Sequence, residues 1–245
     1  MCVGLNDFLQ RLEMLKADKM SYRTFRRKLP DFLFEIDEGN GESYIANVIT
    51  DTYKKYDLRS FTGKTKLLEY KLDGSYKDIV EILNDLDINK CYSNEFEGVI
   101  AINTTALSNY MNWEQFDFFV ESIKKISKYA SIVLFVNIKT EKERKLYEKL
   151  TSELHWFEEY KVENYNTKEL VEMVIEKLDD MGINITARKA LSKALVIVVE
   201  TLDVKVCRDI ELVIDEIVRF VDFYRYMPEI NMNSIERIKK KYKGI

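Results

Sequence analysis

Proline, glycine, cysteine and histidine are scarce in this chain of 245 residues, and each shortage narrows the class of protein. Two prolines and eight glycines are too few for long linkers or low-complexity tails. The three cysteines, Cys2, Cys91 and Cys207, are far apart and lack the spacing of a metal site, which is typical of packed thiols in a reducing compartment. The single histidine, His155, lies beside two aromatic residues in LHWFEEY, and we interpret it as structural rather than catalytic.

Long apolar runs and an excess of positive charge are also missing. No run approaches the roughly 18 apolar residues of a membrane span, and the N-terminus lacks the apolar core of a signal peptide. We therefore expect a cytoplasmic protein with no membrane partner. The net charge of -4 gives no indication of nucleic-acid binding. We interpret the one basic run, KKKYKG at 239–244, as the solvated end of a helix.

Short segments rich in β-branched and aromatic residues alternate with longer segments at helical spacing as far as residue 165. The predicted strands are 32–36, 66–72, 98–103, 131–137 and 159–162. The predicted helices are 5–18, 43–56, 77–86, 113–129 and 141–154. This alternation predicts an α/β domain with a parallel sheet that is covered by helices on both faces.

After residue 165 we expect no further strand. The predicted helices of this part are 167–182, 186–202, 207–224 and 234–242. The first of them closes at Gly182, a predicted C-cap. We therefore divide the chain into three parts: an N-terminal helical segment, an α/β domain of the nucleotide-binding type and a small all-helical domain, at 1–28, 29–164 and 165–245.

The segment after the first predicted strand, IDEGNGES, has the layout of a phosphate-binding loop, because a strand precedes it and a helix follows. Such a loop has the pattern G-x-x-x-x-G-K-[ST]. Its glycines let backbone N–H groups surround the phosphates, its lysine reaches the outer phosphates and its hydroxyl binds Mg²⁺. Gly39, Gly41 and Ser43 fit this pattern. Ile36 replaces the first glycine, and Glu42 replaces the lysine.

A carboxylate at position 42 opposes phosphate binding twice, because an attraction is lost and a repulsion is added. Two unit charges about 4 Å apart interact by roughly 4 kcal/mol at an effective dielectric constant of about 20. We hypothesise that the Glu42 carboxylate occupies the anion position of the empty loop. Ser43 is either a relic magnesium ligand or a helix N-cap. A second glycine-lysine match, FTGKT at 61–65, lacks a preceding strand, and we interpret it as a turn.

With this loop, the strands and the C-terminal helices in place, the sequence resembles AAA+ ATPases, most closely the red-type Rubisco activase and stage V sporulation protein K group, from about Leu29 to Phe223. The resemblance implies a parallel five-stranded core in the order 5-1-4-3-2, with helices on both faces, and a small all-helical lid. The third strand of the family ends in an Asp-Glu pair that binds Mg²⁺ and activates water. Here EGVIAINTT places Asn103 and Thr104 at those positions, and neither can act as a general base. Asn137, at the end of SIVLFVN, matches the polar sensor residue of the fourth strand.

Two further motifs of the family concern a neighbouring subunit and the lid. The arginine fingers, which stabilise the transferred phosphoryl group, correspond to Thr151 and Glu153 in LTSELHWF. Arg208 in VKVCRDIELVIDEIV matches the sensor arginine of the lid, while its own neighbourhood favours an ion pair with Asp209 or Glu211. The relic nucleotide site implied by the resemblance consists of Gly39, Gly41, Ser43, Asn137 and Arg208, with Ile36, Glu42, Asn103 and Thr104 as departures.

The scaffold of the family is therefore present without its catalytic residues, which predicts a pseudo-ATPase with no metal site and no cofactor. We expect a non-hydrolysing structural or regulatory subunit of an oligomeric assembly, whose partner is an AAA+ relative or another copy. The alternative is a protein that binds ATP and Mg²⁺ weakly, or a residual ATPase that acts as a remodelling factor through Lys64 or another lysine. A third interpretation is an adaptor that binds through 5–18 and the aromatic residues of 110–119. It is disfavoured because Phe116 and Phe119 lie one turn apart and predict a buried helix face.

Overall fold

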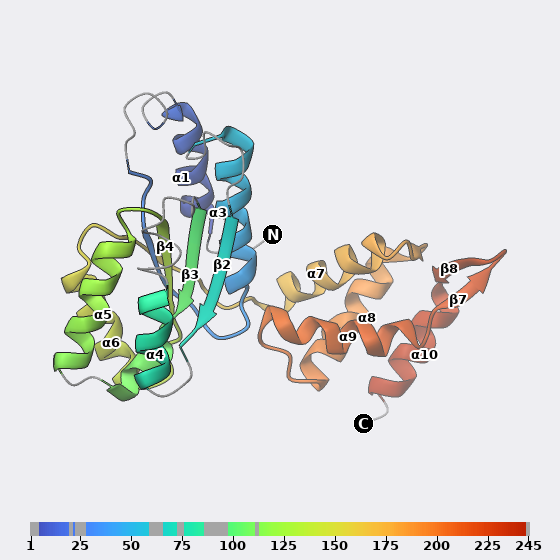
Figure 1. Cartoon of the computed structure of the whole chain (residues 1–245). Coiled ribbons are helices and arrows are strands. Elements are labelled where there is room, and N and C mark those ends of the chain that lie inside the picture. The colour runs from blue at the N-terminus through green and yellow to red at the C-terminus, as the bar shows by residue number, and fades with distance from the viewer. Residues whose placement is uncertain are drawn as a thin grey trace. The chain divides into compact units, whose positions relative to one another are not determined.

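The computed structural model divides the chain after Glu163 into an N-terminal and a C-terminal compact unit (Figure 1). The described residues are 5–19, 22, 28–58, 66–72, 76–85, 98–110 and 113–243. The predicted turn at 61–65 lies outside the described residues, and so do Cys2 and Cys91.

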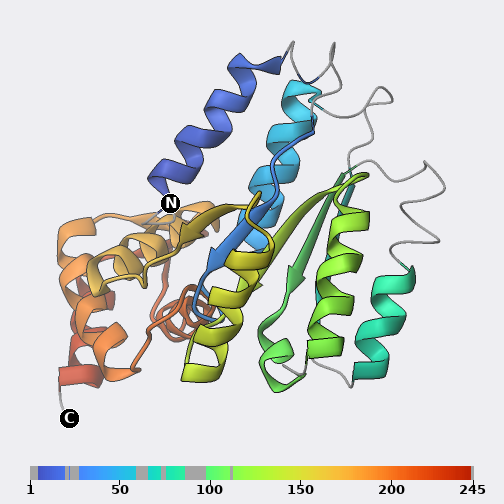
Figure 2. The same ribbon diagram turned by 90° about the vertical axis from the view of Figure 1, so that its left-hand side faces the viewer.

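A five-stranded parallel sheet forms the centre of the N-terminal unit (Figures 1 and 2). Its strands are β1 Phe32–Glu35, β2 Lys66–Lys71, β3 Gly98–Asn103, β4 Ser131–Val136 and β5 Glu158–Lys161. They lie in the order β2-β3-β4-β1-β5, and each neighbouring pair is parallel. This is the predicted order read from the opposite edge, so the prediction is confirmed. Every residue of β3 and β4 is buried, which explains why their sequences lack polar alternation.

Helices cover both faces of this sheet (Figure 2). On one face lie α4 Tyr76–Asn84, α5 Trp113–Ile126 and α6 Glu141–Glu153. On the other lie α1 Asn6–Ala17 and α3 Glu42–Tyr56. Phe116 and Phe119 of α5 belong to the core that α4, α5 and α6 form with the sheet, together with Ile102 and Leu134. The aromatic pattern of α5 is therefore core packing, as predicted.

Helix α1 packs onto the sheet through aromatic contacts and one ion pair. The ring of Phe8 meets Phe34 and Tyr160 edge to face, with ring centroids 5.1 and 5.2 Å away. The guanidinium of Arg11 donates to both carboxylate oxygens of Glu158 on β5, at 2.6 and 2.8 Å. The residues of α1 are therefore part of the N-terminal compact unit.

A buried carboxylate organises the amino ends of the strands. Asp31, directly before β1, accepts a hydrogen bond from the Ile132 N–H at 2.8 Å through Oδ1. Its Oδ2 accepts from the Ser127 hydroxyl at 2.9 Å, the Trp156 indole N–H at 3.1 Å and the Lys28 ammonium at 2.6 Å. Four donors from four separate segments therefore converge on one side chain, which joins β1, β4 and the ends of α5 and α6.

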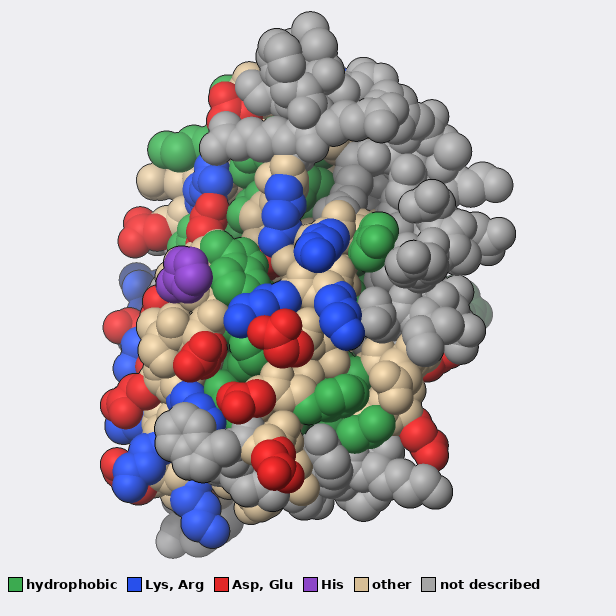
Figure 3. Space-filling model, turned by 60° about the vertical axis from the view of Figure 1, so that its left-hand side comes forward, with side chains coloured by type: hydrophobic (Ala, Val, Ile, Leu, Met, Phe, Trp, Pro, Cys, Tyr) green, Lys and Arg blue, Asp and Glu red, His purple; other side chains and the backbone are tan. Residues whose placement is uncertain are grey.

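Charged side chains of both signs are interspersed on the molecular face in Figure 3. Mixed charge of this kind is typical of an ordinary solvated surface. Within the described residues, no helix has the length and apolar character needed to cross a bilayer.

The C-terminal unit is mainly helical, as predicted. Its helices are α7 Thr167–Asp180, α8 Arg188–Thr201, α9 Ile210–Val218 and α10 Met232–Lys243, with the short 3₁₀ helix η3 Cys207–Asp209 before α9. A capping box begins α7, in which the side chains of Asn166 and Glu169 each accept from the backbone N–H of the other. Gly182 follows α7 with a φ of 76°, and its N–H donates to the Asp179 carbonyl at 2.8 Å. This left-handed ending is the one that favours glycine.

The expectation that no strand follows residue 165 is wrong. The unit holds a small sheet of β6 Asn184–Ile185, β7 Asp222–Tyr224 and β8 Met227–Ile230, in the order β6-β8-β7. The helix predicted for 207–224 is interrupted: α9 ends at Val218, and the last three residues of the predicted helix are β7. The turn between β7 and β8 is made by Arg225 and Tyr226, which are not turn residues, so the sequence carried no hairpin signal.

Candidate functional site

The predicted phosphate loop lies between β1 and α3, at the carboxyl ends of the parallel strands. Gly39 and Gly41 have φ values of 92° and 103°, a conformation that glycine adopts far more readily than other residues. Ile36 is buried, and its N–H donates to the Val136 carbonyl at 3.1 Å. The first glycine of the pattern is thus replaced by a core residue that continues the pairing of β1 with β4.

The start of α3 decides between the two interpretations of Ser43. The N-cap is Gly41, in the left-handed conformation, and Glu42 is the first helical residue. Ser43 is therefore the second residue of the helix, and it is exposed. The N-cap interpretation is wrong, because the cap position belongs to Gly41. The relic magnesium ligand stays a prediction.

The Glu42 side chain points to the ends of β3 and β4. Its Oε1 accepts hydrogen bonds from the side-chain amides of Asn103 at 2.9 Å and Asn137 at 3.0 Å. The Asn137 amide also donates to the Ile36 carbonyl at 2.7 Å. Its described hydrogen bonds thus come from two strand-end amides. That this carboxylate occupies the anion position of the empty loop stays a prediction.

A fourth side chain closes this network. The Thr105 hydroxyl donates to Asn137 Oδ1 at 2.9 Å and accepts from the Asn137 N–H at 2.9 Å. The Thr105 N–H donates to Asn103 Oδ1 at 3.1 Å, and the Asn103 amide also reaches Asn137 Oδ1 at 3.0 Å. Donors and acceptors are matched around Glu42, Asn103, Thr105 and Asn137, which we call the Glu42 cluster. A matched polar network of this kind rigidifies its surroundings.

The two residues at the acidic-pair positions have different surroundings. Asn103 belongs to the Glu42 cluster, whereas Thr104 is buried and bonds the backbone of β4. Its N–H and its hydroxyl both donate to the Phe135 carbonyl, at 2.8 and 3.1 Å. Thr105 was not predicted as a site residue. Its only signal in the sequence is its place two residues after a strand end that faces the loop.

The electrostatics of the loop are set by its carboxylates. Burial raises the pKa of Glu42 above its ordinary value, while the amides of Asn137 and Asn103 oppose this shift and the nearby Glu38 adds to it. Glu38 forms ion pairs with Lys139 at 3.3 Å and Lys71 at 3.5 Å. The hydrogen bond from Lys139 and the charges of both lysines lower the pKa of Glu38. The two cations beside the loop are therefore engaged by a carboxylate of the loop itself.

A cleft of about 230 Å³ opens beside the Glu42 cluster. It is lined by Glu42, Ser43, Glu69, Tyr70, Lys71, Ala101, Asn103 and Phe135. Carboxylates on its wall disfavour a phosphate group there by the Coulomb repulsion given above. Among the described residues, no group of three His, Cys, Asp or Glu side chains is placed to hold a metal ion.

Glu42→Gln is expected to raise the unfolding midpoint by a few degrees at about pH 8, because it removes a partly buried charge and keeps an oxygen that accepts hydrogen bonds from both amides. The folded pKa of Glu42 is raised, so the stability that this group contributes is full below its unfolded pKa and is lost as the pH rises through its folded pKa. The advantage of the variant should therefore shrink toward about pH 4. Thermal unfolding across this range measures it, with Ser43→Ala as the control. A variant that is less stable than the wild type at every pH would contradict the expectation.

Comparisons with known proteins identify the fold that carries this site. No family model matches the sequence, and no curated protein does. One similar solved structure is the Thermotoga maritima RuvB Holliday junction branch migration motor, with a TM-score of 0.59, 16% identity and coverage of 97% of this chain and 69% of that one. A second is domain III of the replication initiation protein DnaA from Thermotoga maritima, with a TM-score of 0.56, 11% identity and coverage of 99% and 93%. A third is C. elegans PCH-2, with a TM-score of 0.55, 10% identity and coverage of 98% of this chain and 68% of that one.

The chain has the AAA+ fold. Strand order, helix placement and the helical C-terminal region agree with these AAA+ neighbours. At such low identity the likeness concerns the fold alone, and the Rubisco activase and sporulation protein group stays a prediction.

The two finger positions and Arg208 take no part in the described hydrogen bonds of the Glu42 cluster. Thr151, at a finger position, is on α6, where its hydroxyl donates to Glu159 on β5 at 3.2 Å. Glu153, at the other finger position, is the last residue of α6. Arg208 belongs to η3 of the C-terminal unit, and its Nε lies 3.9 Å from an Asp209 carboxylate oxygen. The predicted pairing of Arg208 with Asp209 is confirmed. The structure thus brings together Gly41, Glu42, Asn103 and Asn137 within one unit, and Arg208 belongs to the other unit.

Proposed function

We propose that this chain is a non-hydrolysing AAA+-like subunit that acts in an oligomeric assembly by supplying surfaces rather than ATP hydrolysis. The observation that carries the proposal is the Glu42 carboxylate held by the amides of Asn103 and Asn137. By the resemblance, these are the places of the phosphate-binding lysine, an acidic residue of the third strand and the sensor. Where the family has a lysine and an aspartate, this chain thus has a glutamate that accepts hydrogen bonds from two asparagine side chains.

The chemistry of hydrolysis supports the same conclusion. Nucleotide hydrolysis needs a group that orients or deprotonates water and cations that stabilise the transferred phosphoryl group. Asn103 cannot take a proton, and the Thr104 hydroxyl is engaged with a backbone carbonyl. The lysines beside the loop, Lys71 and Lys139, are paired with Glu38. Neither acidic-pair position therefore supplies a base, and both lysines beside the loop are already paired.

The proposed partner is a catalytic AAA+ protein of the same organism, or further copies of this chain. An intact fold beside a site without catalytic residues supports a role in which the surfaces of the subunit, not its loop, are used. The red-type Rubisco activase and sporulation protein group is the proposed branch of the fold. This assignment concerns the architecture of the chain and does not identify the protein on which it acts.

The test combines turnover with assembly. The purified protein is expected to show no Mg²⁺-dependent ATP turnover above that of its Ser43→Ala variant, and to co-elute in size-exclusion chromatography with an active AAA+ protein of its own organism. A protein that stays monomeric alone and with each such relative has no assembly role, and the proposal is then wrong. The matched mixture lacking the relative serves as the control.

A second candidate is weak nucleotide binding, with residual hydrolysis in a remodelling factor. Two observations favour it. Gly39 and Gly41 keep the left-handed backbone of a phosphate loop, and the exposed Ser43 lines the cleft of about 230 Å³. ATP turnover that disappears in Ser43→Ala would establish this function in place of the first.

A further inference from the structure

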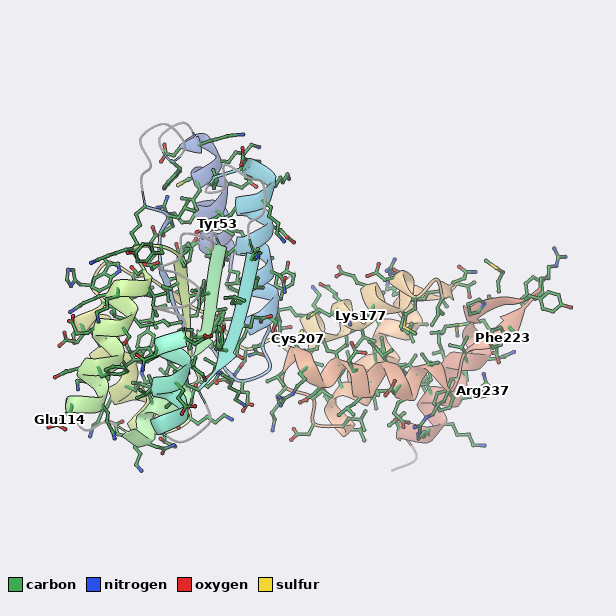
Figure 4. The ribbon with its side chains drawn as sticks, viewed as in Figure 1. Tyr53, Glu114, Lys177, Cys207, Phe223 and Arg237 are labelled. Carbon is green, nitrogen blue, oxygen red and sulfur yellow. The ribbon has the colours of Figure 1, made fainter. Side chains whose placement is uncertain are left out.

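The hairpin of β7 and β8 exposes large side chains at the end of the C-terminal unit (Figure 4). Phe223 and Tyr226 are 76% and 99% exposed, and Tyr224 and Met227 are each more than half exposed. In the described part of the chain, no strand pairs with the outer edge of β7, because the sheet order is β6-β8-β7. An uncovered strand edge is a template for pairing with another strand, and exposed aromatic residues add contact area to such a pairing.

The hairpin is held in a defined geometry. Arg225 and Tyr226 form its two-residue turn with φ values of 49° and 68°, a conformation that usually selects asparagine and glycine. Large side chains therefore stand at a turn where they strain the backbone. At the base, the Asp222 carboxylate accepts from the Ser234 hydroxyl at 2.8 Å and from Arg237 at 2.7 Å. A rigid protrusion loses little conformational freedom when it meets a partner.

The strand register decides which backbone groups face the free edge. The two-residue turn makes Tyr224 and Met227 a hydrogen-bonded pair. Pairs alternate along an antiparallel ladder, so Phe223 and Pro228 form a pair that is not hydrogen-bonded. The N–H and C=O of Phe223 therefore point to the outer edge. A second β7 running antiparallel can place its own Phe223 opposite, and the two residues then exchange two N–H···O=C bonds across a two-fold axis.

The charges around β7 permit this pairing. Edge strands are commonly guarded by charged side chains that point outward. The only charge in β7 is Asp222, and its carboxylate is held by Ser234 and Arg237 of α10. Arg225 lies beyond the strand, over the ring of Tyr224 at 5.2 Å. In a two-fold pairing centred on Phe223, the two arginines lie at opposite ends of the contact.

A nucleic-acid strand fits this surface less well. Single-stranded nucleic acid needs a basic groove beside the stacking rings. Several cations of the neighbouring helix α10 are engaged in ion pairs: Lys239 pairs with Glu236 at 2.7 Å, and Lys241 pairs with Glu216. The chain also carries a net charge of -4, which repels phosphates at long range.

We propose that two copies of this chain pair edge to edge through β7, joining two three-stranded sheets in the order β6-β8-β7-β7-β8-β6. The two Phe223 rings are neighbours on one face of the joined sheet. The contact is a short edge with an aromatic tip, so it belongs to the small, transient interfaces and gives a weak dimer that depends on concentration. The inference goes beyond the proposed function, because the pairing needs neither nucleotide nor an AAA+ relative.

Analytical ultracentrifugation of the full chain, from low to a few hundred micromolar, tests the pairing. Phe223→Pro removes the ring and the outward N–H without removing a hydrogen bond inside the hairpin, and proline is tolerated on edge strands. Leu212→Ser is the matched control, since Leu212 is an exposed apolar residue of α9 in the same unit. We expect a monomer–dimer equilibrium in the wild type, an association weakened at least about tenfold in Phe223→Pro, and no change in Leu212→Ser.

Disulfide trapping tests the register independently of the proline variant. In a background with Cys2, Cys91 and Cys207 replaced by serine, Phe223→Cys is expected to form a covalent dimer under mild oxidation. The two-fold places the two residues opposite each other, at a Cα separation that a disulfide can span. Arg225→Cys, two residues along the chain, is expected to cross-link far less.

Three results would overturn the inference. The first is a wild type that stays monomeric at a few hundred micromolar. The second is a dimer that Phe223→Pro leaves unchanged, which assigns the association to another surface. The third is binding of labelled single-stranded DNA that requires Tyr226, without dimer formation. If one of these results is found, co-elution with an AAA+ relative that persists in Phe223→Pro still leaves the proposed function standing.

Discussion

Asp31→Ala is expected to lower the free energy of unfolding by about 3 kcal/mol, near the lower end of the loss from breaking a buried ion pair. The change removes the only described acceptor of the buried Ile132 N–H and of the Trp156 indole N–H, and a buried donor without an acceptor costs about 1–3 kcal/mol. The ammonium of Lys28 is partly exposed and can return to water, which limits the loss. Urea unfolding followed by tryptophan fluorescence measures the effect.

Glu38→Ala is the matched control for burial, because Glu38 is also a carboxylate paired with lysine but its side chain is partly exposed. Glu38→Ala is expected to lower the free energy of unfolding by at most about 1 kcal/mol. Asp31→Asn should fall between the two, since one amide oxygen still accepts from Ile132 while the charge is gone. Equal losses in Asp31→Ala and Glu38→Ala would mean that the buried network contributes nothing beyond an exposed ion pair.

The double variant Glu42→Lys with Asn103→Asp is expected to be more stable than its two single variants predict, by about 3 kcal/mol of coupling energy. Asn103→Asp alone sets a carboxylate against the Glu42 carboxylate, where an amide now donates at 2.9 Å. At about 4 Å and an effective dielectric constant near 20, such a repulsion is about 4 kcal/mol, and a lysine at position 42 turns it into an attraction. A double-mutant cycle in urea unfolding gives the coupling. Additive losses would mean that Glu42 and Asn103 do not interact.

The same variants also test whether the loop binds nucleotide. The double variant restores the lysine of the phosphate-loop pattern and an acidic residue on the third strand, so Mg-ATP at about a hundred times its dissociation constant should stabilise it by about 2.7 kcal/mol. The wild type is expected to show no shift of its unfolding midpoint with Mg-ATP. Glu42→Gln is the control, because it removes the anion without adding a cation. A wild-type shift as large as that of the double variant would show that the natural loop holds nucleotide.

Local patterns predict this fold well where the environment is uniform. β3 and β4 were found because both of their faces are covered, which leaves runs without polar residues. The order of the strands came from the family resemblance, since local patterns do not encode which strands pair. β7 was missed because VRFVDFY continues the apolar spacing of α9, and no glycine or asparagine marks the turn at Arg225 and Tyr226.

The sequence predicted which residues form most of the site but not which hydrogen bonds they make. Glu42 was identified from the loop pattern, and Asn103 and Asn137 were identified from the family resemblance. The latter two lie at strand ends, which parallel strands bring to one edge of the sheet. Which acceptor each amide chooses depends on side-chain rotamers and on neighbours distant in sequence, and no spacing rule contains that information. Thr105 is the clearest case: its hydroxyl completes the cluster only because its loop folds back onto Asn137.

The closed hydrogen bonding of the Glu42 cluster bears on how long this protein survives when cellular energy is short. A protein whose loop is ordered by bound nucleotide gains stability from that ligand and opens more often when the ligand is scarce, so proteases cleave it faster. Here the groups that tie the loop to the ends of β3 and β4 all belong to the chain. If the loop holds no nucleotide in the cell, as proposed, the turnover of this protein in starved cells should match its turnover in well-fed ones.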